Sequence, residues 1–348
     1  MLEKKTNIYS LSSEELFASL IKGDTKSYRV QQLLNWLYQK FVNDTNGMTN
    51  LPLSFRKELN DKFSFSLPEI IKKVDSKDGS TKYLLKLEDD EKIEMVLMPS
   101  EEKTTLCLSS QVGCSRDCKF CATGKLGLTR NLQTHEIIGQ IVLAMKLLSP
   151  NILTNIVFMG MGEPMDNFEN LIKSLKILAD TEALCFSARR TTVSTCGVVP
   201  QIRRFADSGV KAKLAVSLNS AIDSKRDELM PVNRLYPLAE LKDSLRHYLS
   251  KNTFRITFEY VLIKDFNMGR EDLKALIKFT GDLSCKINLI SWNQVVGLAY
   301  KSPDVSETNN FRASLLKVNK AVMFRDSRGN DIAAACGQLA YNYNMNEG

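Results

Sequence analysis

The chain has 348 residues, of which 43% are hydrophobic and 25% are charged, and its formal net charge is +7. This is the composition of a soluble globular protein with room for one large domain and an accessory module, or for two domains. No apolar run is long enough to span a membrane, and no apolar signal region follows Met1–Lys5, which excludes membrane and secreted proteins and predicts a cytoplasmic one. The positive charge is compatible with a polyanionic partner such as nucleic acid.

Residues 1–68 predict a small helical domain. Apolar residues recur at helical spacing over 12–23, 27–43 and 54–63. Ser12 and Glu15 have the spacing of a capping box, in which each side chain bonds the other's backbone at a helix start. Such a module is expected to pack against the main domain.

Residues 69–100 predict a short β-meander. The runs 83–87 and 93–98 have strand composition, and Asp78-Gly79 supplies a turn before the first run. Glu94 lies on the second run, where the simplest interpretation is an outward-facing strand residue.

A strand–helix alternation begins near residue 103. Helical spacing over 134–148 is one example of the intervening helices. The alternation predicts an α/β protein whose parallel sheet curls into an open (β/α)6 partial TIM barrel over residues 101–335, followed by a C-terminal segment, 336–348. The six predicted strands are Thr104–Ser109, Ile156–Met159, Thr191–Ser194, Lys213–Ser217, Ile256–Ile263 and Ile287–Ser291.

Small and hydrogen-bonding residues directly follow five of these strands. They occupy 114–121, 159–164, 194–197, 217–220 and 291–293. In β/α barrels the chemistry gathers at the carboxyl ends of the strands, so these segments are expected to share one rim. Ordinary turn composition explains any one of them, but explains five in register poorly.

Three cysteines, Cys114, Cys118 and Cys121, form a C-x3-C-x2-C pattern, and Cys107 lies seven residues upstream. Thiolates this close repel one another unless a cationic centre shares them, which indicates a metal or cluster site. Three thiolates can hold three irons of a [4Fe–4S] cluster and leave the fourth iron open to a ligand. Zinc is the alternative, although no second cysteine pair follows to close its coordination. The remaining cysteines lack ligand spacing and are expected to be small core residues: Cys185, Cys196 and Cys285.

The cysteine pattern resembles the signature of the radical S-adenosylmethionine (SAM) superfamily. Its flanks, Cys-Leu-Ser-Ser-Gln-Val-Gly-Cys at 107–114 and Cys-Lys-Phe-Cys-Ala-Thr-Gly at 118–124, resemble those of the RNA adenine methyltransferases of the RlmN/Cfr family. The resemblance spans nearly the whole chain and implies a methyltransferase whose [4Fe–4S] cluster is held by Cys114, Cys118 and Cys121. It also implies that the helical domain engages RNA, so its basic residues become candidates for phosphate contact: Arg29, Lys40, Arg56 and Lys57.

The resemblance extends to SAM binding. Gly160-x-Gly162-Glu163 is similar to the radical SAM "GGE" motif, whose carboxylate accepts hydrogen bonds from the SAM ammonium. Asn219 stands where many relatives have His, so a backbone contact is the one expected to persist there. The residues at positions where the family contacts the carboxylate, ribose and adenine of SAM are Ser194, Ser217, Leu218, Asn219 and Asn293.

The resemblance further implies two catalytic cysteines and a base. Cys336, in the run 325–339, matches the methyl carrier, Cys107 matches its partner, and Glu94 matches a general base near the target adenine. In the implied reaction Cys336 takes a methyl group from one SAM, and a 5′-deoxyadenosyl radical from a second SAM removes a hydrogen from that methyl group. The carbon radical adds to adenine, and a Cys107–Cys336 disulfide releases the product. A flavodoxin- or ferredoxin-like donor supplies the electrons.

Two positions favour the branch that methylates C2 of a 23S rRNA adenine and, in bacteria, of the adenosine 3′ to the tRNA anticodon. Pro164 stands where the sister branch, which methylates C8 and confers antibiotic resistance, typically has alanine. Val112 stands where that branch tends to have Cys. The C8 branch is therefore the first alternative. The others are a zinc-binding RNA-binding protein without catalysis and a radical SAM enzyme acting on a small molecule.

Overall fold

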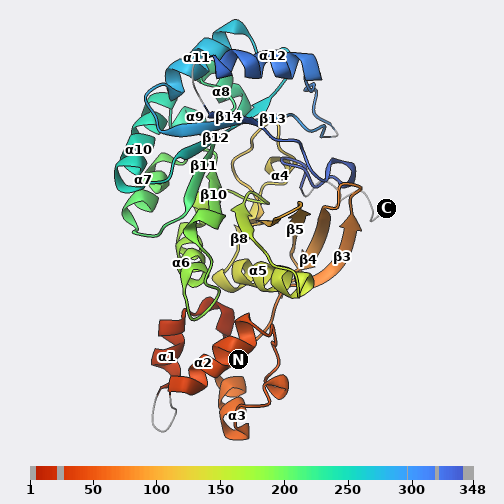
Figure 1. Ribbon diagram of the computed structural model, residues 1–348, viewed down its shortest axis with the longest axis vertical. Coiled ribbons are helices and arrows are strands. Elements are labelled where there is room, and N and C mark those ends of the chain that lie inside the picture. Colours follow the sequence, from red (N-terminus) through yellow and green to blue (C-terminus); the bar gives the residue numbers. More distant parts are fainter. Residues whose placement is uncertain (1–4, 22–26, 296, 318–320, 340–348) are drawn as a thin grey trace.

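The computed structural model describes residues 5–21, 27–295, 297–317 and 321–339. Its centre is a ten-stranded sheet with the order β14-β13-β12-β11-β10-β9-β6-β5-β4-β3 (Figure 1). The strands from β6 to β14 run parallel. They are β6 (Thr104–Leu108), β9 (Asn155–Phe158), β10 (Thr191–Thr195), β11 (Lys213–Ser217), β12 (Ile256–Leu262), β13 (Cys285–Ser291) and β14 (Ala321–Phe324).

All six predicted barrel strands are present, and the predicted fold class is confirmed. The sheet ends at β3 on one side and β14 on the other, so the barrel is open. The prediction missed β14, a four-residue strand at the sheet edge. Only Val322 is buried in it, so the alternation that marks a half-buried strand is weak there.

Three antiparallel strands extend the sheet beyond β6. They are β3 (Glu69–Asp75), β4 (Thr81–Lys86) and β5 (Lys92–Pro99). The predicted meander is therefore present, with the addition of β3, whose residues are mostly exposed and do not show a strand pattern. A small separate ribbon pairs β7 (Gln111–Gly113) with β8 (Leu128–Asn131) on either side of the cysteine pattern.

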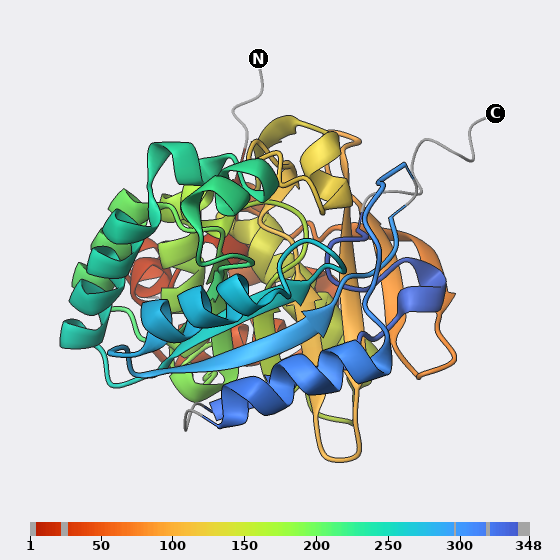
Figure 2. The same ribbon diagram turned by 90° about the horizontal axis from the view of Figure 1, so that it is seen from above.

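Helices cover the outer side of the curved sheet, as the view from above shows (Figure 2). The predicted helix over 134–148 is present with those bounds. The longer helices are α5 (Thr134–Leu148), α6 (Phe168–Ala179), α7 (Val199–Asp207), α10 (Leu238–Lys251), α11 (Arg270–Thr280) and α12 (Val305–Leu316). The shorter ones are α4 (Ala122–Lys125), α8 (Asp223–Leu229) and α9 (Val232–Leu235), and 3-10 turns occupy Pro164–Asn167, Ala188–Arg190 and Asn330–Ile332.

The N-terminal helices form a group of their own at one end of the molecule, beside α5 and α6 (Figure 1). They are α1 (Ser13–Leu20), α2 (Ser27–Tyr38) and α3 (Leu53–Lys62), with the short parallel pair β1 (Thr6–Asn7) and β2 (Phe63–Ser64) and 3-10 turns at Ile8–Ser10 and Thr45–Gly47. The predicted Ser12–Glu15 capping box is present. The second helix ends at Tyr38, earlier than predicted, because the backbone turns left-handed at Phe41 (φ 56°).

Polar contacts attach this group to the main domain. The backbone N–H of Ser13 donates to Asp180 Oδ2 at 3.1 Å, and Lys173 Nζ pairs with Glu15 Oε1 at 2.9 Å. Across the described part of the chain, no helix combines the length and hydropathy needed to cross a bilayer.

Candidate active site

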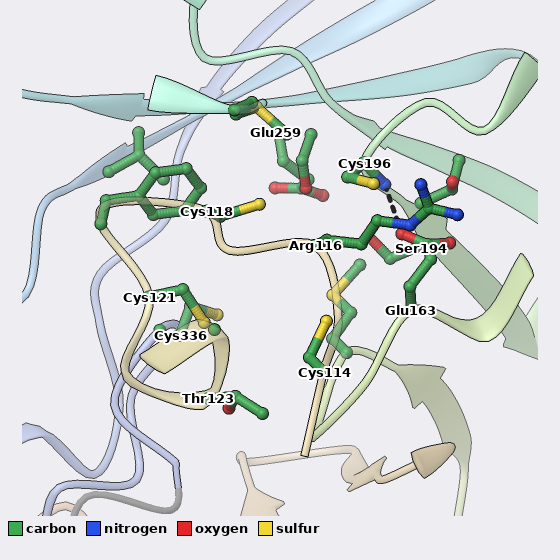
Figure 3. A pocket seen from close by; sticks show the side chains of 18 of the residues that line it. Cys114, Arg116, Cys118, Cys121, Thr123, Glu163, Ser194, Cys196, Glu259 and Cys336 are labelled. Carbon is green, nitrogen blue, oxygen red and sulfur yellow. Dashed lines mark hydrogen bonds between the residues drawn. The ribbon is translucent and has the colours of Figure 1, made fainter. Parts of the chain in front are cut away.

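The carboxyl ends of the parallel strands surround one cavity, drawn in Figure 3, with about 1010 Å³ of empty space including its open mouth. The five polar segments predicted to share a rim all contribute to its wall. This follows from parallel pairing, because strands that run in one direction deliver their following loops to the same edge.

Cys114, Cys118 and Cys121 line this cavity from a single loop between β7 and α4 (Figure 3). Gly113 begins the loop with φ 77°, and a Cβ there would lie 1.9 Å from the carbonyl oxygen of Gly127, so only glycine fits. Burial raises the pKa of Cys114 to about 12. Burial, followed by the nearby Cys121 and Cys114 thiols, also raises the pKa of Cys118.

This donor set fits a cluster site, because three thiols from one loop face one cavity and thiolates that share a cationic centre cease to repel one another. Among the residues that the structure describes, no three Cys, His, Asp or Glu side chains form a group that could hold a single metal ion, whereas in a cluster each thiolate binds a different iron.

Glu163 lies at the wall facing the cysteines and is only 4% exposed. Its Oε1 accepts from the backbone N–H of Met165 at 3.0 Å, and its Oε2 accepts from that of Cys196 at 2.7 Å. Burial raises the pKa of Glu163, and these two N–H donors oppose that rise. The preceding Gly162 has φ 98°, and a Cβ there would lie 2.5 Å from Gln111 Cβ. The carboxylate is thus fixed in position beside the cavity.

Ser194, Ser217 and Asn293 also line the cavity, from the carboxyl ends of β10, β11 and β13. Leu218 and Asn219 do not line it. Leu218 is fully buried, and Asn219 Oδ1 accepts from the backbone N–H of Val261 at 2.9 Å.

A second cavity adjoins the first, and Cys336 lines both. Cys107 lines the second cavity together with Arg325. Burial and the nearby Cys336 thiol raise the pKa of Cys107 to about 12. Desolvation by the surrounding protein atoms raises the pKa of the Cys336 thiol, although the residue is exposed to the cavities, and the Arg325 guanidinium opposes that rise. The two cysteines predicted to act together, 229 positions apart in the sequence, therefore share one cavity wall.

The loop that carries Cys336 is bonded to the cysteine loop. Ala122, next to Cys121, donates its backbone N–H to the carbonyl of Gly337 at 2.7 Å, and Thr123 Oγ1 donates to the carbonyl of Leu339 at 3.1 Å. Asn293 Nδ2 donates to the carbonyl of Cys336 at 3.1 Å. The predicted segment 336–348 is described only as far as Leu339.

Glu94 is buried, with 3% exposure, rather than outward-facing. Its Oε1 pairs with Lys82 Nζ at 3.1 Å, and Lys82 Nζ also donates to the carbonyl of Ala333 at 3.1 Å. Glu94 is not among the residues lining either cavity. The ion pair nevertheless connects it to the loop that carries Cys336.

Sequence reasoning missed several residues of this site. Arg116 forms a two-point pair with Asp166 at the cavity wall, and Glu259 on β12 lines the cavity between Ser217 and Asn293. Neither belongs to a spacing pattern, so only the strand order could have indicated Glu259.

The structure divides the three cysteines that were expected in the core. Cys285 is buried as predicted. Cys196 is buried too, but it also lines the cavity. For Cys185 the prediction was wrong, because this residue is exposed on a loop after α6, with left-handed φ of 52°.

Comparison with family models matches residues 108–280 to the radical SAM superfamily and residues 6–64 to the N-terminal domain of ribosomal RNA large subunit methyltransferases. The chain is 40% identical over 345 residues to a probable dual-specificity RNA methyltransferase RlmN of Dictyoglomus turgidum, covering 98% of this chain and 99% of that one. It is 42% identical over 340 residues to the dual-specificity RNA methyltransferase RlmN of Geobacter sulfurreducens, covering 97% and 93%.

The fold agrees with these relatives. The crystal structure of a radical SAM methyltransferase from Sphaerobacter thermophilus superimposes with a TM-score of 0.92 at 39% identity, covering 97% of this chain and 99% of that one. Membership of the radical SAM superfamily implies a [4Fe–4S] cluster and SAM. A cavity lined by three cysteines, two family models and whole-length relatives lead to one conclusion: the chain belongs to the RlmN family of radical SAM RNA methyltransferases and is an enzyme of this type.

Proposed function

We propose that this enzyme methylates C2 of a specific adenine in 23S rRNA, and of the adenosine 3′ to the tRNA anticodon, through a methyl group carried on Cys336. The position of Cys336 is the observation that carries this assignment. It lines both the cavity of the three-cysteine loop and the cavity of Cys107. One side chain can thus receive a group from a ligand in the first cavity and deliver it toward the second.

Cys114, Cys118 and Cys121 would hold the cluster, and Gly162, Glu163, Ser194, Ser217 and Asn293 would bind SAM. Glu163 is suited to the SAM ammonium, since it is buried and fixed by two backbone N–H groups. Leu218 and Asn219, whose side chains do not line the cavity, would contact SAM through their backbone atoms. When bound, the cluster supplies the electron that cleaves SAM and so creates a carbon radical.

The first half of the reaction is nucleophilic. The Cys336 thiolate attacks the methyl group of one SAM, forming a sulfur–carbon bond as the sulfonium–methyl bond breaks. In the second half, methyl-Cys336 gives up one hydrogen atom to the 5′-deoxyadenosyl radical from the second SAM, which becomes 5′-deoxyadenosine, and the carbon radical left on Cys336 adds to C2 of adenine. Two SAM molecules are consumed for each methyl group delivered.

The release step explains why a second cysteine shares the cavity wall. The adduct loses the C2 proton, with Glu94 as the base, and one electron, which would return to the oxidised cluster, and the aromatic ring is restored. Cys107 Sγ then attacks Cys336 Sγ, forming an S–S bond and breaking the S–CH2 bond, whose carbon keeps the electron pair and takes a proton. A flavodoxin- or ferredoxin-like donor returns the disulfide to two thiols with two electrons and two protons.

Nucleoside mass spectrometry tests this function. The protein is incubated with SAM, a reductant and either 23S rRNA or tRNA, and the digested nucleosides are identified. We expect 2-methyladenosine from both RNAs. Formation of 8-methyladenosine would assign the chain to the C8 chemistry instead, and product from rRNA alone would remove tRNA from the proposal.

Iron analysis tests the cofactor independently of RNA. Anaerobic reconstitution should give a brown protein with about four irons per chain, as one [4Fe–4S] cluster requires. A colourless protein that retains zinc would contradict the cluster. A protein that cleaves SAM but never carries a methyl group on Cys336 would point to radical chemistry on a small molecule.

A further inference from the structure

Glu259 is the one acidic side chain in the cavity wall, apart from Glu163, among the residues that the structure describes. The residue is 6% exposed, and it lies on β12 with its carboxyl group at the cavity (Figure 3). Oε1 accepts from Asn288 Nδ2 at 3.0 Å and lies 4.0 Å from Arg325 Nη1. Oε2 has no hydrogen-bond partner within the described residues.

A buried carboxyl oxygen without a partner is costly, and almost all such atoms in native proteins are satisfied by protein, water or ligand. Arg325 does not account for Oε2, because the shorter of its contacts is to Oε1 and is itself long for an ion pair. Glu259 lines the cavity, so a ligand bound there is the partner that we consider for its carboxyl group.

Strand register places this oxygen relative to the proposed SAM contacts. Glu259 is the register partner of Ser217 on β11, and both side chains line the cavity. On the other side, β13 leads into Asn293. Glu259 therefore lies between Ser217, at the position where the family contacts the ribose, and Asn293, at the position where it contacts the adenine, while Glu163, beyond β10, is proposed for the ammonium.

We propose that Glu259 binds the ribose hydroxyls of SAM through its unpartnered Oε2. The inference rests on the SAM site proposed above. A hydroxyl suits this position because it both donates and accepts, so it can pair with the carboxylate or with the protonated acid. An ammonium group, which only donates, would require the carboxylate.

Binding of S-adenosylhomocysteine and its 2′-deoxy and 3′-deoxy analogues to the reconstituted protein, measured by calorimetry, tests this contact without turnover. Wild type should bind at least one deoxy analogue about tenfold or more weakly than the parent, because a buried acceptor loses its donor. In Glu259→Met the parent should weaken by a similar factor, and the discrimination should disappear.

Two further variants keep the test interpretable. Glu259→Gln retains Oε1 for Asn288 and replaces Oε2 with an NH2 group, to which a ribose hydroxyl can still turn as acceptor. It should therefore keep most of the discrimination. Glu136→Met is the matched control, because Glu136 is equally buried but pairs with Arg130 outside the cavity. It should discriminate like wild type. Iron content and thermal midpoint identify any variant that fails to fold.

Each remaining outcome overturns the inference. If Glu259→Met discriminates between the probes as wild type does, Oε2 meets water rather than the ribose. If wild type binds all three probes equally, no hydroxyl contact exists, although the SAM site stands. If Glu259→Gln loses discrimination as fully as Glu259→Met, the partner only donates. If wild type binds none of the probes, the SAM site itself is wrong, and the assignment of Glu259 falls with it.

Discussion

Cys336 and Cys107 share a cavity wall, yet their surroundings differ. Cys336 is exposed to both cavities, whereas Cys107 is 8% exposed and opens only to the second. A methyl carrier needs access to both the donor and the acceptor, while a resolving thiol needs access only to the carrier. The two positions fit those separate roles, and substituting each cysteine should therefore stop the reaction at a different stage.

Cys336→Ala removes the proposed methyl carrier. It should abolish RNA methylation, with no product above background, while iron content and the cluster's absorption stay at wild-type levels, because the three ligands are unchanged. Nucleoside mass spectrometry and iron analysis measure these outcomes. Residual methylation at even a few per cent of the wild-type rate would mean that the methyl group takes another route.

Cys107→Ala should stop the reaction later. Cys336 is still methylated and still adds to adenine, but nothing attacks its sulfur, so the protein should remain covalently joined to RNA. A denaturing gel with labelled RNA would show a slowly migrating band that Cys336→Ala lacks. If both variants are inactive and free of RNA, the division of roles between the two cysteines is wrong.

At the scale of elements, the β-meander holds the segment that carries Cys336. Ser76 and Lys77, at the end of β3, bond Asp331, while Asp78 Oδ2 accepts from the backbone N–H of Gly329 at 2.7 Å. Lys82 on β4 reaches the carbonyl of Ala333. The antiparallel extension thus fixes the C-terminal loop over the open side of the barrel.

Lys82→Met should be strongly destabilising. It leaves Glu94 buried without its cation and Ala333 without its donor, for which about 3 kcal/mol is expected. Lys86→Met is the matched control on the same strand, because Lys86 makes an exposed pair with Glu69 at 3.1 Å, and exposed ion pairs contribute little to stability. Thermal or urea unfolding compares the two variants. If both variants lose the same free energy of unfolding, the buried Lys82–Glu94 pair stabilises the fold no more than the exposed Lys86–Glu69 pair does.

Acid should weaken the hydrogen bond by which Asp78 holds the C-terminal loop. Burial acts to raise the pKa of Asp78, but hydrogen bonds, first from the Gly329 N–H, outweigh it and hold the pKa at about 2. A carboxyl with a lowered pKa stabilises the fold above its unfolded value of about 4, and that stability is lost as the pH falls toward 2. Asp78→Ala should therefore lower the melting temperature at pH 6 but have less effect at pH 3. If the melting temperatures of Asp78→Ala and wild type differ by the same amount at pH 3 and pH 6, the ionised Asp78 carboxylate does not stabilise this loop.

Local patterns predicted the elements well, and contacts across elements poorly. That Cys114, Cys118 and Cys121 face one cavity was predictable from their spacing, and the six barrel strands were predictable because each is an apolar run between helices. Glu259 was missed, since within Ile-Thr-Phe-Glu-Tyr-Val-Leu it resembles any strand residue until its neighbours are known. The Lys82–Glu94 pair is diagonal across β4 and β5, so it depends on a register that the sequence leaves open.

For the whole molecule, the net charge of +7 is compatible with an RNA partner, and the N-terminal helices are the proposed contact. The structure separates the four basic candidates. Arg29 and Arg56 donate to backbone carbonyls of their own domain, whereas Lys40 and Lys57 are exposed. The two lysines are therefore the better candidates for phosphate contact.

Lys40→Glu combined with Lys57→Glu should weaken RNA binding and reduce the slope of log affinity against log salt by about 2, one for each lost phosphate contact. SAM cleavage without RNA should be unchanged. The same charge change at Lys274 and Lys278 is the control, because both are exposed on α11, at the other end of the molecule (Figure 1). Salt-dependent binding assays give the slopes, and equal losses in both pairs would indicate net charge rather than a local contact.

The hydrogen bond between Ala122 and Gly337 has a consequence for oxygen exposure. It joins the residue after Cys121 to the residue after Cys336. If the cysteine loop holds the cluster as proposed, oxygen that destroys the cluster would also remove the metal from this loop and should weaken its hydrogen bonds to the C-terminal segment. Loss of the cluster would thus affect the segment of Cys336 through a hydrogen bond between the residues that follow Cys121 and Cys336. A protein without its cluster would then be less able to consume SAM on a methyl group that it cannot deliver.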